Sequence, residues 1–390
     1  MKDVNIICGT DEIISKPLQA YDDRVINFLS DLSRALMNIR AWPDVVSLGF
    51  WCRRANLEKM RSTCHEYNFR IGRGLCFHIA PSNIPVNFAF SYMFGLISGC
   101  ANIIRVPSKN FEQVNIILDI VNEKLKSYPE IYSRTQFIKY PSDNNNITAE
   151  YSLKSDARLI WGGDATIKNI RALESKPRCI DICFADRYSI ALINSEAVMN
   201  ANEADLKRLA ENFYNDTFLI DQNACSSPNI IFWLNDNENK PARLKFWQAV
   251  HEYSDSKYKI QASIGVNKFS KACEDAINFD IQSTRYNNKN LIWLAELKNL
   301  DENLDTFRGS SGYFYEYVLN NYDELFKIIN SKYQTLTYYG IDADELQSLI
   351  IKNNLTGIDR ITPIGRALDI GIIWDGFDIV RTLSRIVNKE

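Results

Sequence analysis

The residue best suited to chemistry in this sequence is Cys225, which stands among small and polar residues. The segment 221–228 reads Asp-Gln-Asn-Ala-Cys-Ser-Ser-Pro and lies between an apolar stretch typical of a helix and an apolar strand at 230–234. Structural cysteines usually behave as small hydrophobic residues of the core, so these neighbours indicate an accessible thiol. One interpretation is a nucleophilic thiolate, which needs an electropositive or helix-terminal setting. The other is a loop cysteine without a catalytic function.

An asparagine between two prolines is a second candidate. The segment 77–85 predicts a strand end followed by Pro81, Asn83 and Pro85, and then a helix. A side-chain amide that is held rigidly can donate a hydrogen bond to an oxyanion as it develops in a reaction. The alternative is that Asn83 only caps the following helix.

Two cations and a hydroxyl follow the next predicted strand. Arg105, Ser108 and Lys109 lie at or just beyond the end of an apolar strand at 102–106. In open α/β sheets, ligands bind at the carboxyl ends of the strands, where these side chains could hold an adenosine 2′-phosphate. The alternative is a solvated charged loop.

A pair of glycines follows a further strand at 157–161. Gly162 and Gly163 precede a predicted helix that begins near residue 165. Such a turn lets a phosphate approach a helix N-terminus, although the glycines could also form only a tight turn with Asp164 as helix cap. No Gly-x-Gly-x-x-Gly motif lies between a strand and a helix, so the usual dinucleotide fingerprint is missing.

Composition narrows the class of protein. The chain has 390 residues, 46% hydrophobic residues and a formal net charge of −3, which argues against nucleic acid as its main partner. Nine scattered cysteines without a signal peptide predict a reducing, cytoplasmic location and no disulfide framework. The cysteine and histidine spacings predict no metal site. The longest apolar stretch, about 88–101, is too short to span a bilayer.

Strands and helices alternate from residue 74 onward, which predicts an α/β protein with a mainly parallel sheet covered on both faces. Helices are expected within 21–66 and near 86–99, 110–127, 203–214, 241–254, 265–277, 322–330 and 343–353. Strands are expected near 75–80, 136–140, 188–193 and 333–339. The polar segment 278–312 is expected to be irregular, and the chain to end in an amphipathic helix.

Taken together, these segments resemble the aldehyde dehydrogenase superfamily, and more closely its acyl-CoA reductase family of the bioluminescence fatty-acid reductase type. The matching segments occur in the family's order, and they are 50–57, 78–85, 105–109, 221–228, 334–335, 359–361 and 374–376. The resemblance implies an aldehyde-dehydrogenase-like α/β fold with a Rossmann-type cofactor domain at 1–195 and an α/β catalytic domain at 196–360. The segment 361–390 would return to the cofactor domain or to a subunit interface.

The resemblance also implies residue roles. Cys225 matches the family's nucleophile, and Asn83 matches the oxyanion asparagine, which works with the backbone N–H of Cys225. Three residues fall where the superfamily holds the adenine ribose, with Val106 as an extra residue before the proline: Arg105, Ser108 and Lys109. Gly162 and Gly163 fall near the turn that faces the pyrophosphate. The cofactor would be NADPH, with NADH as the alternative.

One departure from the superfamily indicates the type of reaction. Aldehyde-oxidising members carry a glutamate that activates the hydrolytic water, whereas the corresponding stretch here, 183–189, contains none. A general base beside an acyl-enzyme would hydrolyse it before hydride arrives, so its loss suits a thioester reductase. Asp186 is the alternative, displaced base.

The expected reaction is reduction of an acyl-CoA or acyl-protein thioester, with a fatty acyl group as the family default, in a homo-oligomer that could work beside an acyl-activating partner protein. The alternatives are reduction of an acyl phosphate, reduction of a short polar acyl group destined for a surface polysaccharide, aldehyde oxidation, a thioesterase or acyltransferase that uses Cys225, and a non-catalytic subunit.

Overall fold

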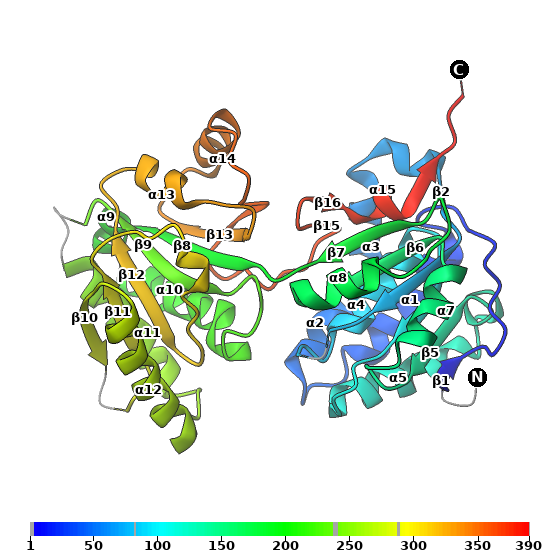
Figure 1. Cartoon of the computed structure of the whole chain (residues 1–390), viewed down its shortest axis with the longest axis horizontal. Helices are drawn as coiled ribbons and strands as arrows, with labels where there is room; N and C mark the ends of the chain where they lie inside the picture. The colour runs from blue at the N-terminus through cyan, green and yellow to red at the C-terminus, as the bar shows by residue number, and fades with distance from the viewer. Residues whose placement is uncertain (1–3, 82, 237–240, 287–288, 390) are drawn as a thin grey trace. The chain divides into compact units, whose positions relative to one another are not determined.

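The computed structural model describes residues 4–81, 83–236, 241–286 and 289–389 (Figure 1). Its contacts divide the chain into two compact units. Unit 1 comprises Met1–Ala185 and Gly371–Glu390, and unit 2 comprises Asp186–Ile370. The domain boundaries expected from the sequence, after residues 195 and 360, lie within unit 2, and the functions expected of the domains stay predictions.

A six-stranded sheet forms the centre of unit 1 (Figure 1). Its strands, in spatial order, are β1 (Asn5–Gly9), β5 (Thr135–Lys139), β4 (Ala101–Arg105), β3 (Leu75–Ile79), β6 (Ala157–Trp161) and β7 (Ile180–Phe184). Only β1 runs antiparallel to its neighbour. Every residue of β3 is buried, as expected for a parallel strand covered on both faces.

Helices pack around this sheet. They are α1 (Asp23–Leu36), α2 (Pro43–Trp51), α3 (Arg54–Ser62), α4 (Asn87–Ile97), α5 (Glu112–Leu125), α6 (Pro129–Tyr132), α7 (Asn145–Lys154) and α8 (Asp164–Arg171), with a 3₁₀ turn at His65–Phe69. α4 is mostly apolar and entirely buried. Asp22 caps α1 by accepting a hydrogen bond from the backbone of Arg24. Pro43 is the first residue of α2, where its missing N–H costs no hydrogen bond.

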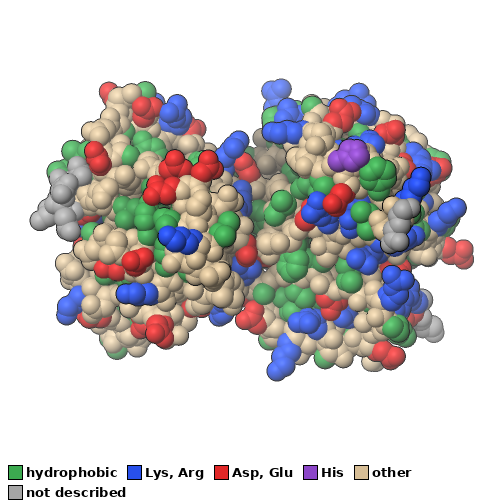
Figure 2. Space-filling model, turned by 90° about the horizontal axis from the view of Figure 1, so that it is seen from above, with side chains coloured by type: hydrophobic (Ala, Val, Ile, Leu, Met, Phe, Trp, Pro, Cys, Tyr) green, Lys and Arg blue, Asp and Glu red, His purple; other side chains and the backbone are tan. Residues whose placement is uncertain are grey.

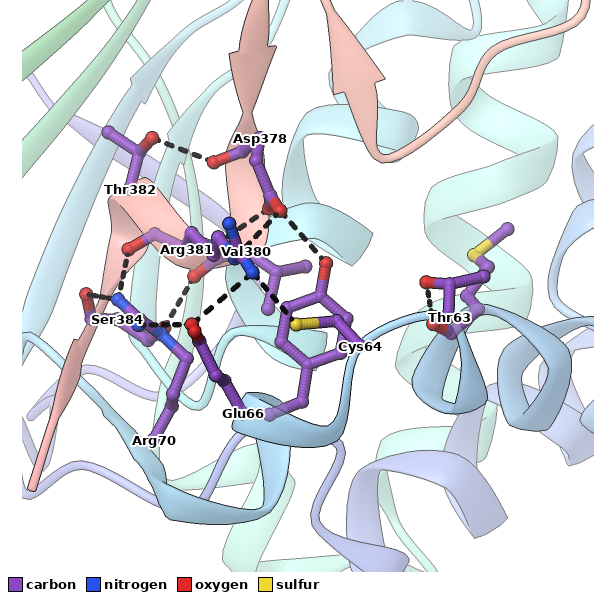
Figure 3. Close-up of polar contacts among 11 residues, drawn as sticks. Thr63, Cys64, Glu66, Arg70, Asp378, Val380, Arg381, Thr382 and Ser384 are labelled. Atoms are coloured by element: carbon purple, nitrogen blue, oxygen red, sulfur yellow. Dashed lines mark hydrogen bonds and ion pairs between the residues drawn. The ribbon is translucent and has the colours of Figure 1, made fainter.

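The C-terminal segment is fastened to unit 1 by polar contacts (Figure 3). It contains β15 (Ile373–Trp374), β16 (Phe377–Asp378), α15 (Ile379–Leu383) and β17 (Ser384–Ile386), which pairs with β2 (Arg70–Gly72). The Arg70 Nε–H donates to Ser384 Oγ at 2.8 Å, and the Tyr67 hydroxyl donates to Asp378 Oδ2 at 3.0 Å. Arg381 contacts Cys64 Sγ at 3.0 Å and Glu66 at 3.3 Å.

The expected amphipathic helix at the end of the chain is therefore wrong. Only the five residues of α15 are helical, and the chain then becomes extended. The physical reason is the edge of β2, which offers backbone hydrogen bonds that continued helix would leave unused.

A seven-stranded sheet forms the centre of unit 2. Its strands, in spatial order, are β10 (Ile281–Tyr286), β11 (Trp293–Leu297), β12 (Tyr313–Val318), β9 (Pro228–Leu234), β8 (Tyr188–Asn194), β13 (Tyr333–Tyr339) and β14 (Arg360–Pro363). β10 is antiparallel to β11, and the other pairs are parallel. Two apolar cores lie against this sheet.

Helices also flank the sheet of unit 2. They are α9 (Ser195–Asn200), α10 (Glu203–Asp216), α11 (Pro241–Asp255), α12 (Ala262–Asn278), α13 (Tyr322–Ile328) and α14 (Ala343–Lys352), with 3₁₀ turns at Phe218–Ile220 and Leu304–Thr306. Within the surface of each unit visible in Figure 2, cationic and anionic side chains are interspersed, in keeping with the small net charge.

The expectation of an irregular segment at 278–312 is wrong, because it contains β10 and β11. β10 is an edge strand with alternating half-buried and exposed residues, so it has few apolar residues to reveal it. β11 is buried and pairs with β12. The tertiary pairing supplies the strand character that the local sequence lacks.

Candidate functional site

Three of the predicted segments meet at one edge of the unit 1 sheet. β4, β3 and β6 are parallel neighbours, so their carboxyl ends lie side by side. Asn83 follows β3, Arg105 ends β4, and Gly162 follows β6. The Ala80 N–H donates to the Arg105 carbonyl at 3.3 Å and joins the first two segments. The structure thus gathers Asn83 and the five predicted cofactor residues at the edge where ligands of α/β sheets bind.

Asn83 is exposed and does not cap the following helix. The N-cap of α4 is Val86, and no side chain makes a capping hydrogen bond there. The capping alternative is therefore wrong. The exposed side chain belongs to the loop and not to the end of the helix.

The cationic segment after β4 is partly ordered by aromatic rings. The guanidinium of Arg105 lies 4.7 Å from the centre of the Tyr140 ring, and Lys109 Nζ lies 5.1 Å from that of Phe111. Arg105 is half-buried, and its Nε has no hydrogen-bond partner within the described part of the chain. Ser108 and Lys109 are exposed. These groups can contact an anion without first breaking an ion pair of their own, since none is present among the described residues.

Gly163 has no steric reason to be glycine. It is the N-cap of α8 with φ −68°, which other residues adopt, and a Cβ built there would meet nothing within 4 Å. Asp164 is the first residue of the helix and not its cap, which corrects the capping alternative. The open space leaves room for a ligand to approach the backbone at the helix N-terminus.

His78 lies in the core of the same unit. It is fully buried, and its ring nitrogens contact Ser91 Oγ at 2.8 Å and Asn102 Oδ1 at 3.0 Å. Burial lowers its pKa to about 4, so the ring is neutral at physiological pH. Its two polar contacts are those of a structural histidine.

Cys225 lies in unit 2, at the amino edge of the sheet, just before β9. Its side chain is partly exposed, whereas Ala224 and Ser226 on either side are buried. The loop reverses direction through Asp221 and Gln222, whose φ angles are 54° and 59°. These left-handed conformations are uncommon for residues other than glycine, so the surrounding contacts must hold the loop in place.

The polar residues of the loop supply those contacts. The Gln222 side chain accepts from the Gly312 N–H at 2.6 Å and donates to the Tyr313 carbonyl at 3.2 Å. The Ser227 hydroxyl donates to the backbone carbonyl of Asp216 at 2.6 Å. Asn229 accepts from the Gly309 N–H at 3.2 Å. The polar composition that marked this loop in the sequence therefore also anchors it.

Ser189 fixes the backbone of Cys225 itself. Its buried hydroxyl donates to the Cys225 carbonyl at 2.6 Å and accepts from the Thr335 N–H at 3.2 Å. Ser189 belongs to the stretch that lacks the glutamate, and Thr335 to the matched pair 334–335. Sequence reasoning gave neither residue a role, although both lie in segments that it singled out.

Arg360 brings a positive charge to the same edge. It begins β14, pairs in register with Thr335, and donates to the carbonyls of Ala367 at 2.8 Å and Arg366 at 2.7 Å. Burial lowers its pKa, and the neighbouring charges of Asp369, Asp216 and Cys225 oppose that shift. Arg360 and Cys225 therefore lie at the same edge of the sheet and interact electrostatically.

Asp216 is a buried carboxyl behind the cysteine loop. It accepts hydrogen bonds from the N–H groups of Gly365 at 2.6 Å and Ala367 at 2.8 Å. Burial nevertheless raises its pKa to about 7. Its backbone carbonyl holds Ser227, so it links the 365–367 segment to the cysteine loop.

Asp186, the alternative base, forms an ion pair with Arg308 at 3.1 Å. Within the described ranges, no group of three metal-binding side chains lies together. All nine cysteines are in those ranges, and none is in a disulfide. The helices of the described residues include none with the length and apolarity needed to cross a bilayer.

A model of the family described as acyl-CoA reductase (LuxC) matches residues 12–388 of this chain. Among curated proteins, the long-chain acyl-protein thioester reductase of Aliivibrio fischeri is 22% identical over 167 residues, which are 42% of this chain and 33% of that protein. Long-chain acyl-protein thioester reductase 2 of Photobacterium leiognathi is 26% identical over 172 residues, with the same two coverages. These matches thus span about a third of each relative's length.

Solved structures share the fold. A protein from Burkholderia cenocepacia described as an aldehyde dehydrogenase has a TM-score of 0.61 and 10% identity, and the match covers 95% of this chain and 84% of that one. Proline utilization A from Bdellovibrio bacteriovorus has a TM-score of 0.62 and 12% identity, covering 95% of this chain and 44% of that one. The expected aldehyde-dehydrogenase-like α/β fold is confirmed.

Proposed function

This chain belongs to the acyl-CoA reductase (LuxC) family, and we propose that it reduces an acyl thioester to an aldehyde through a covalent thioester on Cys225. The names of the curated relatives support this reaction. The observation that carries the proposal is the setting of Cys225. Its side chain is partly exposed, while its carbonyl is held by Ser189 and its loop by buried hydrogen bonds.

In the first step, the Cys225 thiolate attacks the carbonyl carbon of the thioester. A new C–S bond forms to Cys225, and the original C–S bond breaks with release of the substrate's thiolate. The Asn83 amide and the Cys225 N–H stabilise the oxyanion between these events. Arg360 favours the attacking thiolate through its charge.

In the second step, the carbonyl carbon gains hydride, the bond to Cys225 breaks, and the aldehyde leaves while Cys225 returns to the thiolate. When bound, a reduced nicotinamide supplies that hydride. The covalent step converts a diffusing thioester into one whose position the protein controls.

NADPH is the proposed cofactor, with NADH as the alternative. Arg105, Ser108 and Lys109 would hold its adenosine end, and Gly162 and Gly163 its pyrophosphate. The open space at Gly163 and the unsatisfied Nε of Arg105 support a ligand at this edge. Two cations near the ribose favour the 2′-phosphate of NADPH.

The acyl-enzyme would be protected from hydrolysis because the chain lacks a general base that could activate water beside it. The stretch 183–189 has no glutamate, and its one carboxylate, Asp186, is paired with Arg308. The proposed substrates are fatty acyl thioesters of CoA or of a protein. A protein thioester would be delivered by an acyl-activating partner.

Mass spectrometry of the intact protein after mixing with fatty acyl-CoA, without nicotinamide, tests the proposal. We expect one added acyl group on the wild type and on Cys273→Ala, an exposed-cysteine control, and none on Cys225→Ala. Adding NADPH or NADH should then release aldehyde, faster with NADPH. An acylated Cys225→Ala protein, or release of free acid in place of aldehyde, would contradict the proposal.

A further inference from the structure

The C-terminal hairpin formed by β15 and β16 has a turn whose residue types and backbone angles agree. Asp375 and Gly376 form this turn, with φ angles of 48° and 74°. Positive φ at both central residues is the requirement of a type I′ turn, which Asp-Gly sequences favour. The segment 374–376 is one of those that resemble the acyl-CoA reductase family, and the proposed reaction gives it no role. The turn explains its aspartate and glycine but not the aromatic residues on either side.

Those two aromatic residues share one face of the hairpin. Trp374 and Phe377 lie directly opposite each other across the two strands, and Ile373 lies opposite Asp378. Paired side chains lie on the same face of a hairpin, and successive pairs lie on opposite faces. Trp374 is buried, whereas Phe377 is 36% exposed. The hairpin therefore presents the Phe377 ring on the same face as the buried Trp374.

The base of the hairpin is fixed to unit 1 (Figure 3). Asp378 caps α15 by accepting a hydrogen bond from the Arg381 N–H at 2.9 Å, and it accepts another from the Tyr67 hydroxyl at 3.0 Å. Beyond α15, the chain pairs with β2 through β17. Phe377 is the residue directly before Asp378, so these bonds also fix the place of its backbone in the unit.

Phe377 lies close to the Gly162–Gly163 turn at the carboxyl edge of the unit 1 sheet. Its ring meets that of Phe184 edge-on, with the ring centres 6.3 Å apart, and the hairpin lies near β7 in Figure 1. Phe184 ends β7, and its carbonyl accepts from the Gly162 N–H at 3.2 Å. Its ring also stacks on that of Trp161, the residue before Gly162, at 3.8 Å. Phe184 thus connects the exposed ring of the hairpin to the turn.

The order of the strands indicates which part of the proposed cofactor would reach this place. The proposed function holds the adenosine end after β4 and the pyrophosphate after β6, which lies two strands further along the sheet. The pyrophosphate is the middle of a dinucleotide, so the nicotinamide end continues past β6 on the side away from β4. The next strand on that side is β7, which ends in Phe184. Phe184 is buried, and the exposed ring beside it is that of Phe377.

We propose that Phe377 contacts the nicotinamide ring of the cofactor and forms an apolar wall of its subsite. This inference rests on the proposed function, which holds the other half of the cofactor at the same edge of the sheet. A nicotinamide ring is flat, and aromatic side chains bind flat rings through stacked or edge-to-face contacts. Aromatic and apolar side chains are also the usual lining of cofactor sites. The family-like segment 374–376 then acts as the turn that positions this ring.

Calorimetric titration of the full chain with NADPH, without a thioester, tests this contact apart from catalysis. Phe377→Ala should raise the Kd for NADPH by roughly three- to tenfold, the loss expected for one aromatic contact. The Kd for 2′-phospho-ADP-ribose, which lacks the nicotinamide, should be the same in this variant and the wild type. NADH and ADP-ribose form the equivalent pair of ligands. Phe377→Tyr keeps the ring and should bind NADPH as the wild type does, and Phe377→Leu replaces the alanine variant if that variant does not fold.

Ile373→Ala is the matched control, because Ile373 is 61% exposed on the opposite face of the same hairpin. Both Kd values should be unchanged in this variant. An unchanged Kd for NADPH in Phe377→Ala, or an equal rise for both ligands, would overturn the inference and leave the proposed function in place. A wild type that is acylated on Cys225 but binds neither NADPH nor NADH would contradict the proposed cofactor site, and this contact with it.

Discussion

The two sheets carry their candidate site residues at different ends of their strands, the carboxyl ends in unit 1 and the amino ends in unit 2. In unit 1, Arg105 ends a parallel strand, and Asn83 and Gly163 lie in the loops that follow the carboxyl ends of two others. In unit 2, Cys225 precedes the amino end of β9, in a loop bonded to its neighbours on several sides. A ligand site needs open backbone and unsatisfied donors, whereas a nucleophile needs a fixed position. The same α/β architecture thus meets two different requirements.

The largest expected loss of activity comes from substitution of Asn83, the candidate catalytic residue at the carboxyl edge of the unit 1 sheet. Asn83→Ala should lower the rate of Cys225 acylation by on the order of 10²–10³, as loss of an oxyanion donor does in other enzymes. Stopped-flow measurement of thiol release from acyl-CoA follows this step without the nicotinamide.

The variant Asn83→Asp separates hydrogen-bond donation from shape. It has the same size, but a carboxylate accepts and cannot donate, so its rate should fall at least as far. If Asn83→Asp acylates at the wild-type rate, Asn83 is not an oxyanion donor. The carboxyl edge of the unit 1 sheet would then bind only the cofactor.

A smaller loss of activity is expected from substitution of Ser189, whose hydroxyl bonds to the Cys225 carbonyl and the Thr335 N–H at the amino edge of the unit 2 sheet. Ser189→Ala should slow acylation by about tenfold, equivalent to about 1.4 kcal/mol, because the Cys225 carbonyl and the Thr335 N–H lose their shared partner. Thiol release again measures the rate.

Thr337→Val is the matched control for Ser189. Thr337 is buried on the same sheet and donates one hydrogen bond to the Ile190 carbonyl at 3.3 Å, away from the cysteine loop. Both variants should lower the melting temperature, but only Ser189→Ala should slow acylation. Equal rates in the two variants would show that Ser189 contributes to stability alone.

The last expected effects concern pH. They act on stability and not directly on the acylation rate, and they have opposite signs in the two units. The pKa of His78 falls from 6.5 to about 4, so its contribution to stability is lost as pH falls from about 6.5 to about 4. The pKa of Asp216 rises from 3.8 to about 7, so its contribution is lost as pH rises across that interval. Each slope should reach roughly 1 kcal/mol per pH unit.

Hydrogen exchange, followed peptide by peptide, resolves the two units. Between pH 4.5 and 6.5, His78→Gln should remove the rise in protection of β3 with pH, and Asp216→Asn should remove the fall in protection near residues 365–367. Unchanged slopes in both variants would assign the pH dependence to other groups.

The local sequence was sufficient for several of the parallel strands, among them β3, β4 and β6, and for the loops that follow them. β3, β4 and β6 are apolar runs bounded by turns, and Cys225 is marked by its polar neighbours. The partners of Cys225 were not predictable in the same way. Ser189, Thr335 and Arg360 are far apart in the chain, and strand pairing brings them to one edge.

α12 shows most clearly which features follow from the local sequence and which depend on tertiary contacts. Its periodicity predicted a helix at 265–277, and the structure has one at Ala262–Asn278. Hydrophobicity alone would turn Val266 and Phe269 inward. The structure instead buries Lys268 and Asp275, because remote carbonyls accept hydrogen bonds from Lys268 and tyrosine hydroxyls donate to Asp275, which also pairs with Lys271 on the same helix. The sequence by itself determined that a helix forms, and only the tertiary structure decided which face it buries, since that choice depends on partners distant in the chain.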